Sequence, residues 1–333
     1  MASSSKPLRV LAVTNLWPVG DSFRGIFVKE QVDALRGMGV HVDVEVVAQE
    51  RGKADYLLAA ARIRRMARDG SYDLIHVHYG MAAWSARFVG QVPRVLSVYG
   101  SDVNVPWQRA VTRLGSGGMA ARIYVSPNLA ANSGDPAGHV IADGVDFSLF
   151  TPGDRAQARA GLGVAPDELA VLFGGHPGND VKGYDVFTDV LAELRRRDLP
   201  VREIVLAEPD QPRSAVPAKF TAADALLFTS RKGSEGSPSV IKEATVMGLP
   251  VVSVNVGDAA VLLDGVDPSA VVEFPEPWGT PATRAELVTA LADQTAKVLA
   301  AGVRSNGRER NARLDSRRVA EQVMAVYREV LHR

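Results

Sequence analysis

The sequence predicts an α/β protein built from two doubly wound domains. Short runs rich in β-branched residues alternate with helical patterns along most of the chain, which is typical of parallel sheets with crossover helices. This alternation stops over residues 144–168, which are rich in Gly, Pro and Asp, and then starts again. The length of 333 residues also suits two domains of ordinary size.

In the first half, a helix is expected between the first two strands. It carries Val28, Val32 and Leu35 on one face, and Gly37 and Gly39 end it. The strands expected here are residues 8–14, 40–47, 73–78, 94–99, 122–126 and 139–142.

In the second half, the last helix expected is residues 317–331, where valines recur at helical spacing. The other helices expected are residues 181–197, 238–247 and 284–299. The strands expected are residues 169–173, 203–207, 225–229 and 250–254. Since ligands of open α/β sheets bind beyond the carboxyl ends of strands, the loops at those ends are where chemistry is expected.

Composition and charge exclude several classes of protein. The chain has no cysteine, which excludes disulfides, thiolate metal sites and a cysteine nucleophile. Its 38 basic and 38 acidic residues produce no overall field toward nucleic acid or an anionic membrane. The start, MASSSKP, lacks the apolar core of a secretory signal, and no stretch is long and apolar enough for a membrane span. We expect a cytoplasmic protein with at most peripheral contact to the inner membrane face.

The most informative stretch is ALLFTSRKGSEGSPSVIKEATVMGLPVVSV, at residues 225–254. A buried strand leads into a loop and then a helix, for which Ser237 is the expected N-cap and Pro238 the first helical residue. The free N–H groups and the positive dipole of a helix start favour a phosphate, and Gly236 permits close approach to the backbone.

Two carboxylates flank this predicted phosphate site. Glu235 precedes the helix, and Glu243 lies inside it on the same face as Ser239. A carboxylate beside a diphosphate is useful if it accepts hydrogen bonds from sugar or ribose hydroxyls. The alternative is a loop carboxylate and a solvated helix residue.

The Glu-x7-Glu arrangement in EGSPSVIKEATVMGLPVVSV resembles the donor-site motif of family 4 retaining glycosyltransferases. Weaker resemblances follow in family order in LAVTNLWPVGDSFRG, YDLIHVHYG, LSVYGSDV, DGVDFSLFTP and VLFGGHPGNDVKGYDVF. The resemblance covers most of the chain. It implies the GT-B fold, in which two Rossmann-like domains face a cleft and the C-terminal helix crosses back to the first domain. The expected domains are residues 1–150 and 169–315, joined by a linker at 151–168 and followed by that helix within 316–333.

The resemblance also implies roles in donor binding. Glu235 would contact the transferred sugar and Glu243 the ribose, while the backbone of Gly236, Ser237, Pro238 and Ser239 holds the diphosphate. Lys182 matches the lysine that neutralises the leaving diphosphate. A fixed ammonium stabilises the charge that develops there, although a solvated lysine at a helix start is the alternative. Gly25 matches a glycine of the first-domain loop, or is an ordinary helix-start glycine.

The sequence departs from the family at two positions. His176 stands where many members carry an arginine, so the positive side of the site is weaker. Tyr99 stands where the family has a histidine, and a phenol is a poor base at neutral pH. His78 either lines the site or is a packed strand-end residue, and Asp102 either orients an acceptor hydroxyl or fixes a loop.

The function expected is transfer of a hexosyl group from a UDP- or GDP-sugar to a hydroxyl acceptor, lipid-linked or soluble. The family's front-face mechanism needs no protein nucleophile. Without a metal-ligand motif, no metal or other cofactor is expected. The alternatives are a non-catalytic nucleotide-sugar-binding subunit of a larger synthase and a GT-B sugar-nucleotide epimerase. An oxidoreductase is disfavoured because the first strand is not followed by G-x-G-x-x-G.

A cluster of arginines is a candidate surface for contact with lipid. Arg62, Arg64, Arg65 and Arg68 lie in one predicted helix, which forms either a lipid-binding face or a solvated basic face.

Overall fold

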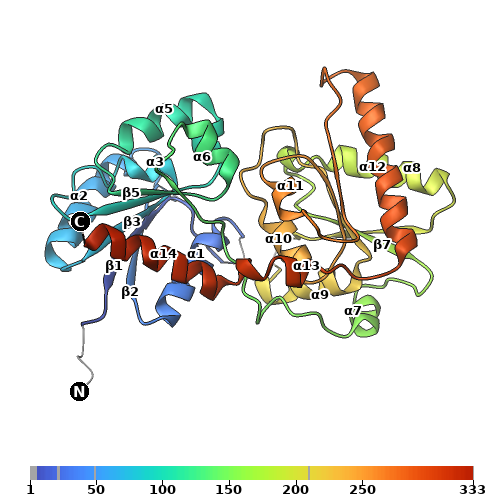
Figure 1. The fold of residues 1–333 in the computed structure, drawn as a ribbon, viewed down its shortest axis with the longest axis horizontal. Coiled ribbons are helices and arrows are strands. Elements are labelled where there is room, and N and C mark those ends of the chain that lie inside the picture. The colour runs from blue at the N-terminus through green and yellow to red at the C-terminus, as the bar shows by residue number, and fades with distance from the viewer. Residues whose placement is uncertain (1–5, 21–22, 49, 209–210, 333) are drawn as a thin grey trace. The chain divides into compact units, whose positions relative to one another are not determined.

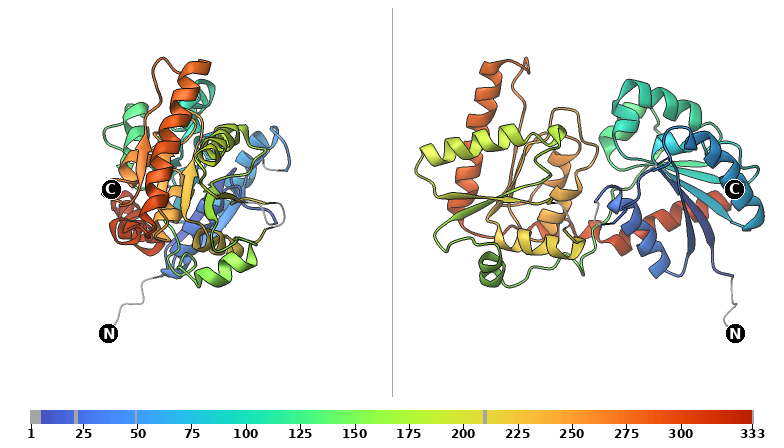
Figure 2. Two further views of the ribbon diagram at one scale, coloured as in Figure 1. Left: turned by 90° about the vertical axis from the view of Figure 1, so that its right-hand side faces the viewer. Right: turned by 180° about the vertical axis from the view of Figure 1, so that it is seen from behind.

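The computed structural model describes residues 6–20, 23–48, 50–208 and 211–332. The chain divides into two compact units, one of Met1–Gly144 with Ser316–Arg333 and the other of Val145–Asp315. Each unit carries one parallel sheet, and helices lie on both faces of each sheet (Figure 1, Figure 2). The prediction of two doubly wound α/β domains is therefore confirmed.

The sheet of the first unit has the strand order β2-β1-β3-β4-β5-β6, with every neighbouring pair parallel. Its strands are β1 (Arg9–Thr14), β2 (His41–Val46), β3 (Leu74–His78), β4 (Arg94–Val98), β5 (Ala121–Tyr124) and β6 (His139–Val140). Its helices are α1 (Ile26–Gly37), α2 (Asp55–Asp69), α3 (Gly80–Ala83), α4 (Ser101–Asn104), α5 (Pro106–Gly115), α6 (Pro127–Ser133) and α14 (Ser316–Leu331).

The C-terminal helix α14 belongs to the core of the first unit. Val319, Val323, Val326 and Val330, which recur at helical spacing, are all buried. They pack with α1 and with one face of the sheet in a single apolar cluster. Helices α2, α3 and α6 cover the opposite face.

The sheet of the second unit has the order β11-β10-β9-β7-β8 and is also parallel. Its strands are β7 (Leu169–Phe173), β8 (Val201–Val205), β9 (Ala225–Phe228), β10 (Val251–Val254) and β11 (Ala270–Val272). Its helices are α7 (Arg155–Gly161), α8 (Tyr184–Arg196), α9 (Val216–Ala222), α10 (Ser239–Val246), α11 (Ala259–Leu262), α12 (Pro281–Ala301) and α13 (Gly307–Arg310). Residues 151–168, expected as a linker, contribute α7 to this unit, where buried Arg159 pairs with Asp224.

The strand orders show where each unit offers a crevice. In the second unit β8 and β9 lie on opposite sides of β7, so the direction in which strands are added to the sheet reverses at β7. In the first unit β2 and β3 flank β1 in the same way. Such switch points are where open α/β sheets bind ligands. Among the described residues, no helix combines the length and apolar character needed to cross a bilayer.

Candidate functional site

Lys182 and Glu235 meet at the switch point of the second unit. Lys182 follows β7 and Glu235 follows β9, two strands that pair in register. The Lys182 Nζ lies 2.7 Å from Glu235 Oε1, and the side chains are 26% and 13% exposed. The structure therefore brings together two of the residues predicted for the site.

Two glycines fix the backbone around Lys182. At Gly183, φ is +66° and a Cβ would lie 2.0 Å from the carbonyl oxygen of Thr229. At Gly175, a Cβ would lie 2.8 Å from Cγ of Lys182. The Thr229 hydroxyl also donates to the carbonyl oxygens of Gly183 and Lys182, at 2.9 and 3.2 Å. The loop that carries Lys182 is thus held against the end of β9, and neither glycine position has room for a larger side chain.

The Glu235 carboxylate has a second donor that the sequence analysis missed. The Ser230 hydroxyl donates to Glu235 Oε1 at 2.7 Å. A hydroxyl and an ammonium therefore meet on the same carboxylate oxygen. The signal for Ser230 was its place two residues after β9, at the carboxyl edge of the sheet.

The helix after Glu235 begins later than expected. Helix α10 starts at Ser239 and its N-cap is Pro238, so the predictions of Ser237 as N-cap and Pro238 as first helical residue are wrong by one position. Pro238 has an extended ψ of 112°, which delays the helix. No side chain caps α10, since the Ser237 hydroxyl donates instead to Asp258 Oδ2 at 2.9 Å. Its N-terminal dipole can therefore act on a ligand.

Gly236 lies against another part of the backbone. A Cβ on Gly257 would come within 2.8 Å of the Gly236 carbonyl oxygen, and Gly257 has φ of +59°. The loop before α10 thus lies against residue 257, a contact that the sequence analysis did not predict.

Glu243 is buried in α10 and is not a solvated helix residue. Its side chain is 6% exposed, and Oε1 accepts a 2.7 Å bond from Arg213. Arg213 opens a short 3₁₀ turn, Arg213–Ala215, and its guanidinium lies 4.8 Å from the Phe150 ring centroid. This arginine comes from the segment between β8 and α9, and it has no predicted role.

His176 lies in the same loop as Lys182 and is exposed. Its Nδ1 accepts the backbone N–H of Gly178 at 3.0 Å. If this bond is kept, Nε2 is the ring nitrogen left to face a ligand.

In the first unit, the predicted residues His78 and Tyr99 belong to one buried polar network. His78 Nδ1 lies 2.7 Å from the Tyr99 hydroxyl, and the rings of His76 and His78 are 4.0 Å apart. His76 contacts the Tyr327 hydroxyl of α14 at 2.6 Å and Ser97 at 2.8 Å. Burial lowers the pKa of His78 to about 3 and raises that of Tyr99, so both stay neutral near pH 7.

One atom of this network lacks a partner. His78 Nε2 is buried and makes no hydrogen bond within the described part of the chain. If the Tyr99 hydroxyl donates to Nδ1, neutral His78 carries its proton on Nε2 and can donate it to an oxygen acceptor. His78 lies at the end of β3, beside the switch point of its sheet.

Asp102 is fully buried and holds loop backbone. Its oxygens accept the N–H groups of Gly100 at 2.7 Å, Tyr99 at 3.1 Å and Gly80 at 3.1 Å. Burial raises its pKa, and these bonds act in the opposite direction. The geometry favours loop fixing over contact with an acceptor hydroxyl. Asp102 joins the loops after β3 and β4, including Tyr79 with its unusual φ of 77°.

Gly25 has a structural reason to be glycine. It is the N-cap of α1 with φ of +76°, and a Cβ would lie 2.3 Å from the Leu16 carbonyl carbon. Close approach of two backbone segments within the first unit thus requires this glycine.

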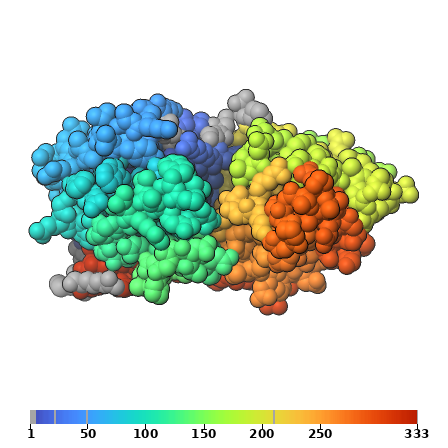
Figure 3. Space-filling view, turned by 90° about the horizontal axis from the view of Figure 1, so that it is seen from above, coloured from blue at the N-terminus to red at the C-terminus, as the bar shows by residue number. Residues whose placement is uncertain are grey.

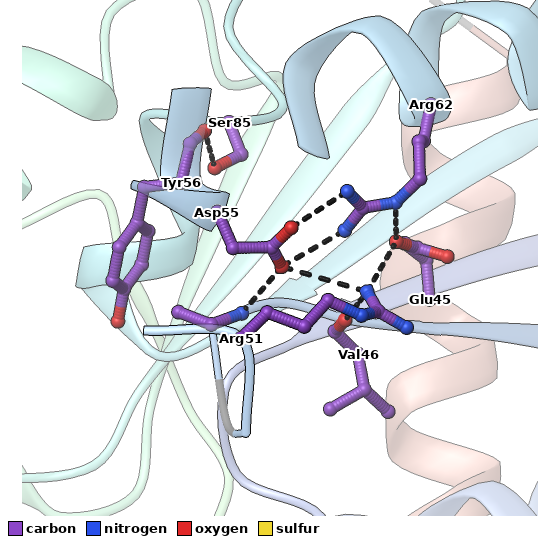
Figure 4. Close-up of polar contacts among 8 residues, drawn as sticks. Glu45, Val46, Arg51, Asp55, Tyr56, Arg62 and Ser85 are labelled. Carbon is purple, nitrogen blue, oxygen red and sulfur yellow. Dashed lines mark hydrogen bonds and ion pairs between the residues drawn. The ribbon is translucent and has the colours of Figure 1, made fainter. Parts of the chain in front are cut away.

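The basic helix α2 is partly neutralised by acidic neighbours (Figure 4). Arg62 donates to both oxygens of Asp55 at 2.7 and 2.9 Å and to Glu45 at 2.7 Å. This bonding lowers the pKa of buried Asp55 to about 2. Arg62 therefore ties α2 to β2, while Arg64, Arg65 and Arg68 are exposed. The prediction that all four arginines form one basic face is wrong for Arg62.

Comparison with known proteins gives sequence and structural matches. A family model described as "Glycosyl transferase 4-like" matches residues 25–113. The D-inositol 3-phosphate glycosyltransferase of Actinosynnema mirum is 30% identical over 251 residues, covering 59% of this chain and 60% of that protein.

Solved structures match nearly the whole chain. Sucrose-phosphate synthase of Thermosynechococcus elongatus matches with a TM-score of 0.75 and 19% identity, covering 97% of this chain and 99% of that chain. HepE of Anabaena, solved with UDP-glucose, matches with a TM-score of 0.67 and 19% identity, covering 97% and 100%. At this identity the likeness shows the fold alone.

The two parallel-sheet units and these structural matches define the GT-B class of fold. Within it, residues 25–113 match the "Glycosyl transferase 4-like" model and the relative in sequence is a glycosyltransferase, so the chain is similar to family 4 glycosyltransferases. The chain spans only 60% of the length of the Actinosynnema relative.

Proposed function

We propose that this protein transfers a hexosyl group from a nucleotide-diphosphate sugar to a hydroxyl acceptor, with retention at the anomeric carbon. The observation that carries the proposal is the Lys182–Glu235 pair at the switch point of the second unit. Beside it lies the start of α10, which no side chain caps. An ammonium, a helix start and a carboxylate suit a sugar diphosphate, and HepE is described with UDP-glucose.

The donor replaces the internal partners of both residues. Lys182 exchanges the Glu235 carboxylate for an oxygen of the β-phosphate, and Glu235 turns its lone pairs to hydroxyls of the sugar. Neither charge is left without a partner in this exchange, because the phosphate replaces the carboxylate for Lys182 and the sugar hydroxyls replace the ammonium for Glu235. Glu243 accepts hydrogen bonds from the ribose in the same way, next to Arg213.

The transfer step needs no protein nucleophile. The bond between the anomeric carbon and the β-phosphate oxygen breaks, and its electron pair leaves with the phosphate. The acceptor oxygen bonds to the same face of the anomeric carbon, and its proton passes to the departing phosphate oxygen. Lys182 stabilises the charge that develops on that phosphate, and such a contribution is worth roughly 3–4 kcal/mol. Since Lys182 and the helix dipole supply positive charge, we propose that the reaction is independent of metal ions, and full activity in EDTA is the expected result.

The experiment is a donor screen followed by a transfer assay. Thermal unfolding with UDP- and GDP-sugars identifies the donor, because a ligand of the native state raises the melting temperature. The donor that stabilises the protein is then incubated with hydroxyl acceptors, and NMR of the product gives the anomeric configuration.

The outcomes separate the proposal from its rivals. A product with retained configuration supports it. Donor binding without turnover on any acceptor favours a non-catalytic subunit, and conversion of the donor without acceptor favours an epimerase. An inverted product contradicts the front-face step.

A further inference from the structure

Arg231 joins the two loops that carry Lys182 and Glu235. It follows β9 and precedes Glu235 in the same loop. Its backbone N–H donates to the Val181 carbonyl oxygen at 2.9 Å. Its carbonyl oxygen accepts the Ser234 N–H at 3.1 Å and the Ser234 hydroxyl at 2.7 Å. One backbone group of Arg231 thus holds the turn of Lys182, and the other holds the turn that leads to Glu235.

The Arg231 side chain adds two contacts to the Lys182 turn. Its Nε donates to the Asp180 carbonyl oxygen at 3.2 Å, and its Nη2 lies 2.7 Å from Asp185 Oδ1. Asp180 opens the 3₁₀ turn that ends at Lys182, and Asp185 lies in the first turn of α8, which follows. A guanidinium can make both contacts at once, because its N–H groups point in fixed directions in one plane. The side chain therefore contacts the chain on both sides of Lys182.

A second arginine fixes the carboxylate that Arg231 contacts. Arg284, near the start of α12, lies 2.6 Å from Asp185 Oδ2 and 2.6 Å from Asp189 Oδ2. Helices α8 and α12 contact each other, and both lie at the surface in the view of Figure 3, α8 in lime and α12 in dark orange. The four side chains of this row are 35% to 49% exposed. Because exposed ion pairs stabilise a fold little, we expect the row to act on the position of the loop more than on stability.

We propose that Arg231 is a positioning residue for the transfer step, an inference that rests on the proposed function. The Lys182 ammonium must meet the phosphate oxygen on which charge develops, and a misplacement of about 1 Å can lower a rate about 100-fold. By holding the Asp180 carbonyl and the Asp185 carboxylate, Arg231 keeps the Lys182 turn against the loop of Glu235. The ammonium and the carboxylate then face one donor together. Arg231 acts through Lys182 and does not itself bind the donor.

The test is a double-mutant cycle of Arg231→Gln and Lys182→Gln in the full chain, with the nucleotide-sugar that the donor screen identifies. Arg231→Gln removes both side-chain contacts and keeps both backbone contacts, so we expect a partial loss. It should lower kcat about tenfold, leave the donor KM within about twofold and leave the melting temperature unchanged. In the Lys182→Gln background the same substitution should lower kcat no further, because the group through which it acts is gone.

A matched control separates this effect from the loss of any surface arginine. Arg202 lies on β8 of the same unit, is 49% exposed and pairs with Glu168 at 3.8 Å. Arg202→Gln should keep the kcat, the donor KM and the melting temperature of the wild type.

A second measurement needs no donor. Hydrogen exchange of the peptide that spans residues 179–184 reports on the Lys182 turn, since the Lys182 N–H donates to the Asn179 carbonyl oxygen at 2.9 Å. Arg231→Gln should speed exchange in this peptide about tenfold, because local opening becomes easier. Arg202→Gln should leave the exchange unchanged.

Several results would overturn the positioning role. Exchange or kcat at the wild-type value in Arg231→Gln would do so, and so would a rise in donor KM alone. A tenfold loss of kcat that persists in the Lys182→Gln background would make Arg231 a donor contact of its own. If the wild-type chain transfers no sugar, the proposed function fails, and the exchange measurement still decides whether Arg231 holds the Lys182 turn.

Discussion

Lys182 and Glu235 contact each other at 2.7 Å although 53 residues separate them in the sequence. The contact exists because β9 lies directly beside β7, so the loops that leave these strands meet at one edge of the sheet. Thr229 and Gly183 hold the two loops together at that edge. The pair is thus a product of sheet topology, and a topology of this kind places ligands at the same point.

Glu235→Gln should lower kcat about 100-fold while the melting temperature changes little. The variant keeps the shape of the side chain but removes the charge that accepts sugar hydroxyls. Steady-state transfer rates with the identified donor measure the effect. Glu276→Gln is the matched control, because Glu276 also pairs with a lysine, Lys232, but is 68% exposed. Equal rates for the two variants would remove Glu235 from the site.

Glu243→Gln should raise the donor KM about tenfold with kcat nearly unchanged, because it removes binding shared by ground and transition states. Arg213→Gln breaks the same ion pair but keeps the carboxylate. If Glu243 only supports Arg213, both variants will destabilise the protein equally and will have the same donor KM. A KM effect in Glu243→Gln that exceeds that of Arg213→Gln supports contact with the donor.

Gly183→Ala should destabilise the protein and impair transfer. The new Cβ would lie 2.0 Å from the Thr229 carbonyl oxygen, so the Lys182 loop must shift. Gly163→Ala is the control, since Gly163 has a similar φ of +64° with nothing within 4 Å. The control should cost about 1 kcal/mol in unfolding free energy, and Gly183→Ala at least about 2 kcal/mol more. If both variants lose the same unfolding free energy in urea, the close contact between Gly183 and Thr229 does not stabilise the fold.

Asp55→Asn should remove stability that depends on pH. The folded pKa of about 2 lies below the usual 3.8, so the Asp55 carboxylate stabilises the fold above about pH 4, and this stabilisation is lost as pH falls toward 2. The unfolding free energies of wild type and variant should differ by about 2 kcal/mol at pH 7 and converge in acid. A difference that stays constant from pH 7 to pH 3 would argue against the depressed pKa.

Most strands of the two sheets could be predicted from the sequence, but the polar contacts could not. The strand at 169–173 is predicted to the residue, because the five residues LAVLF form a short apolar run that the sheet buries. Helices α5 and α6 and strand β11 were not predicted; α6 has seven residues and β11 three, which are too few for a clear period.

For the site, the resemblance placed Lys182, Glu235 and Glu243 together, but it did not reveal their partners. Arg213 reaches Glu243 only through the path of the chain after β8, and no local pattern encodes that path. The Ser237 hydroxyl was expected at a helix cap, but α10 begins one residue later than expected and this hydroxyl bonds Asp258. Local rules predict elements well, whereas side-chain pairing depends on tertiary contacts.

The most direct test of the account is donor turnover by Lys182→Gln beside Lys232→Gln, an exposed lysine in a loop of the same unit. If Lys182 stabilises the leaving diphosphate, its variant should lose at least about 100-fold in kcat, and Lys232→Gln should match wild type. Full activity of Lys182→Gln with the identified donor would contradict the assignment of the Lys182–Glu235 pair as the centre of the site.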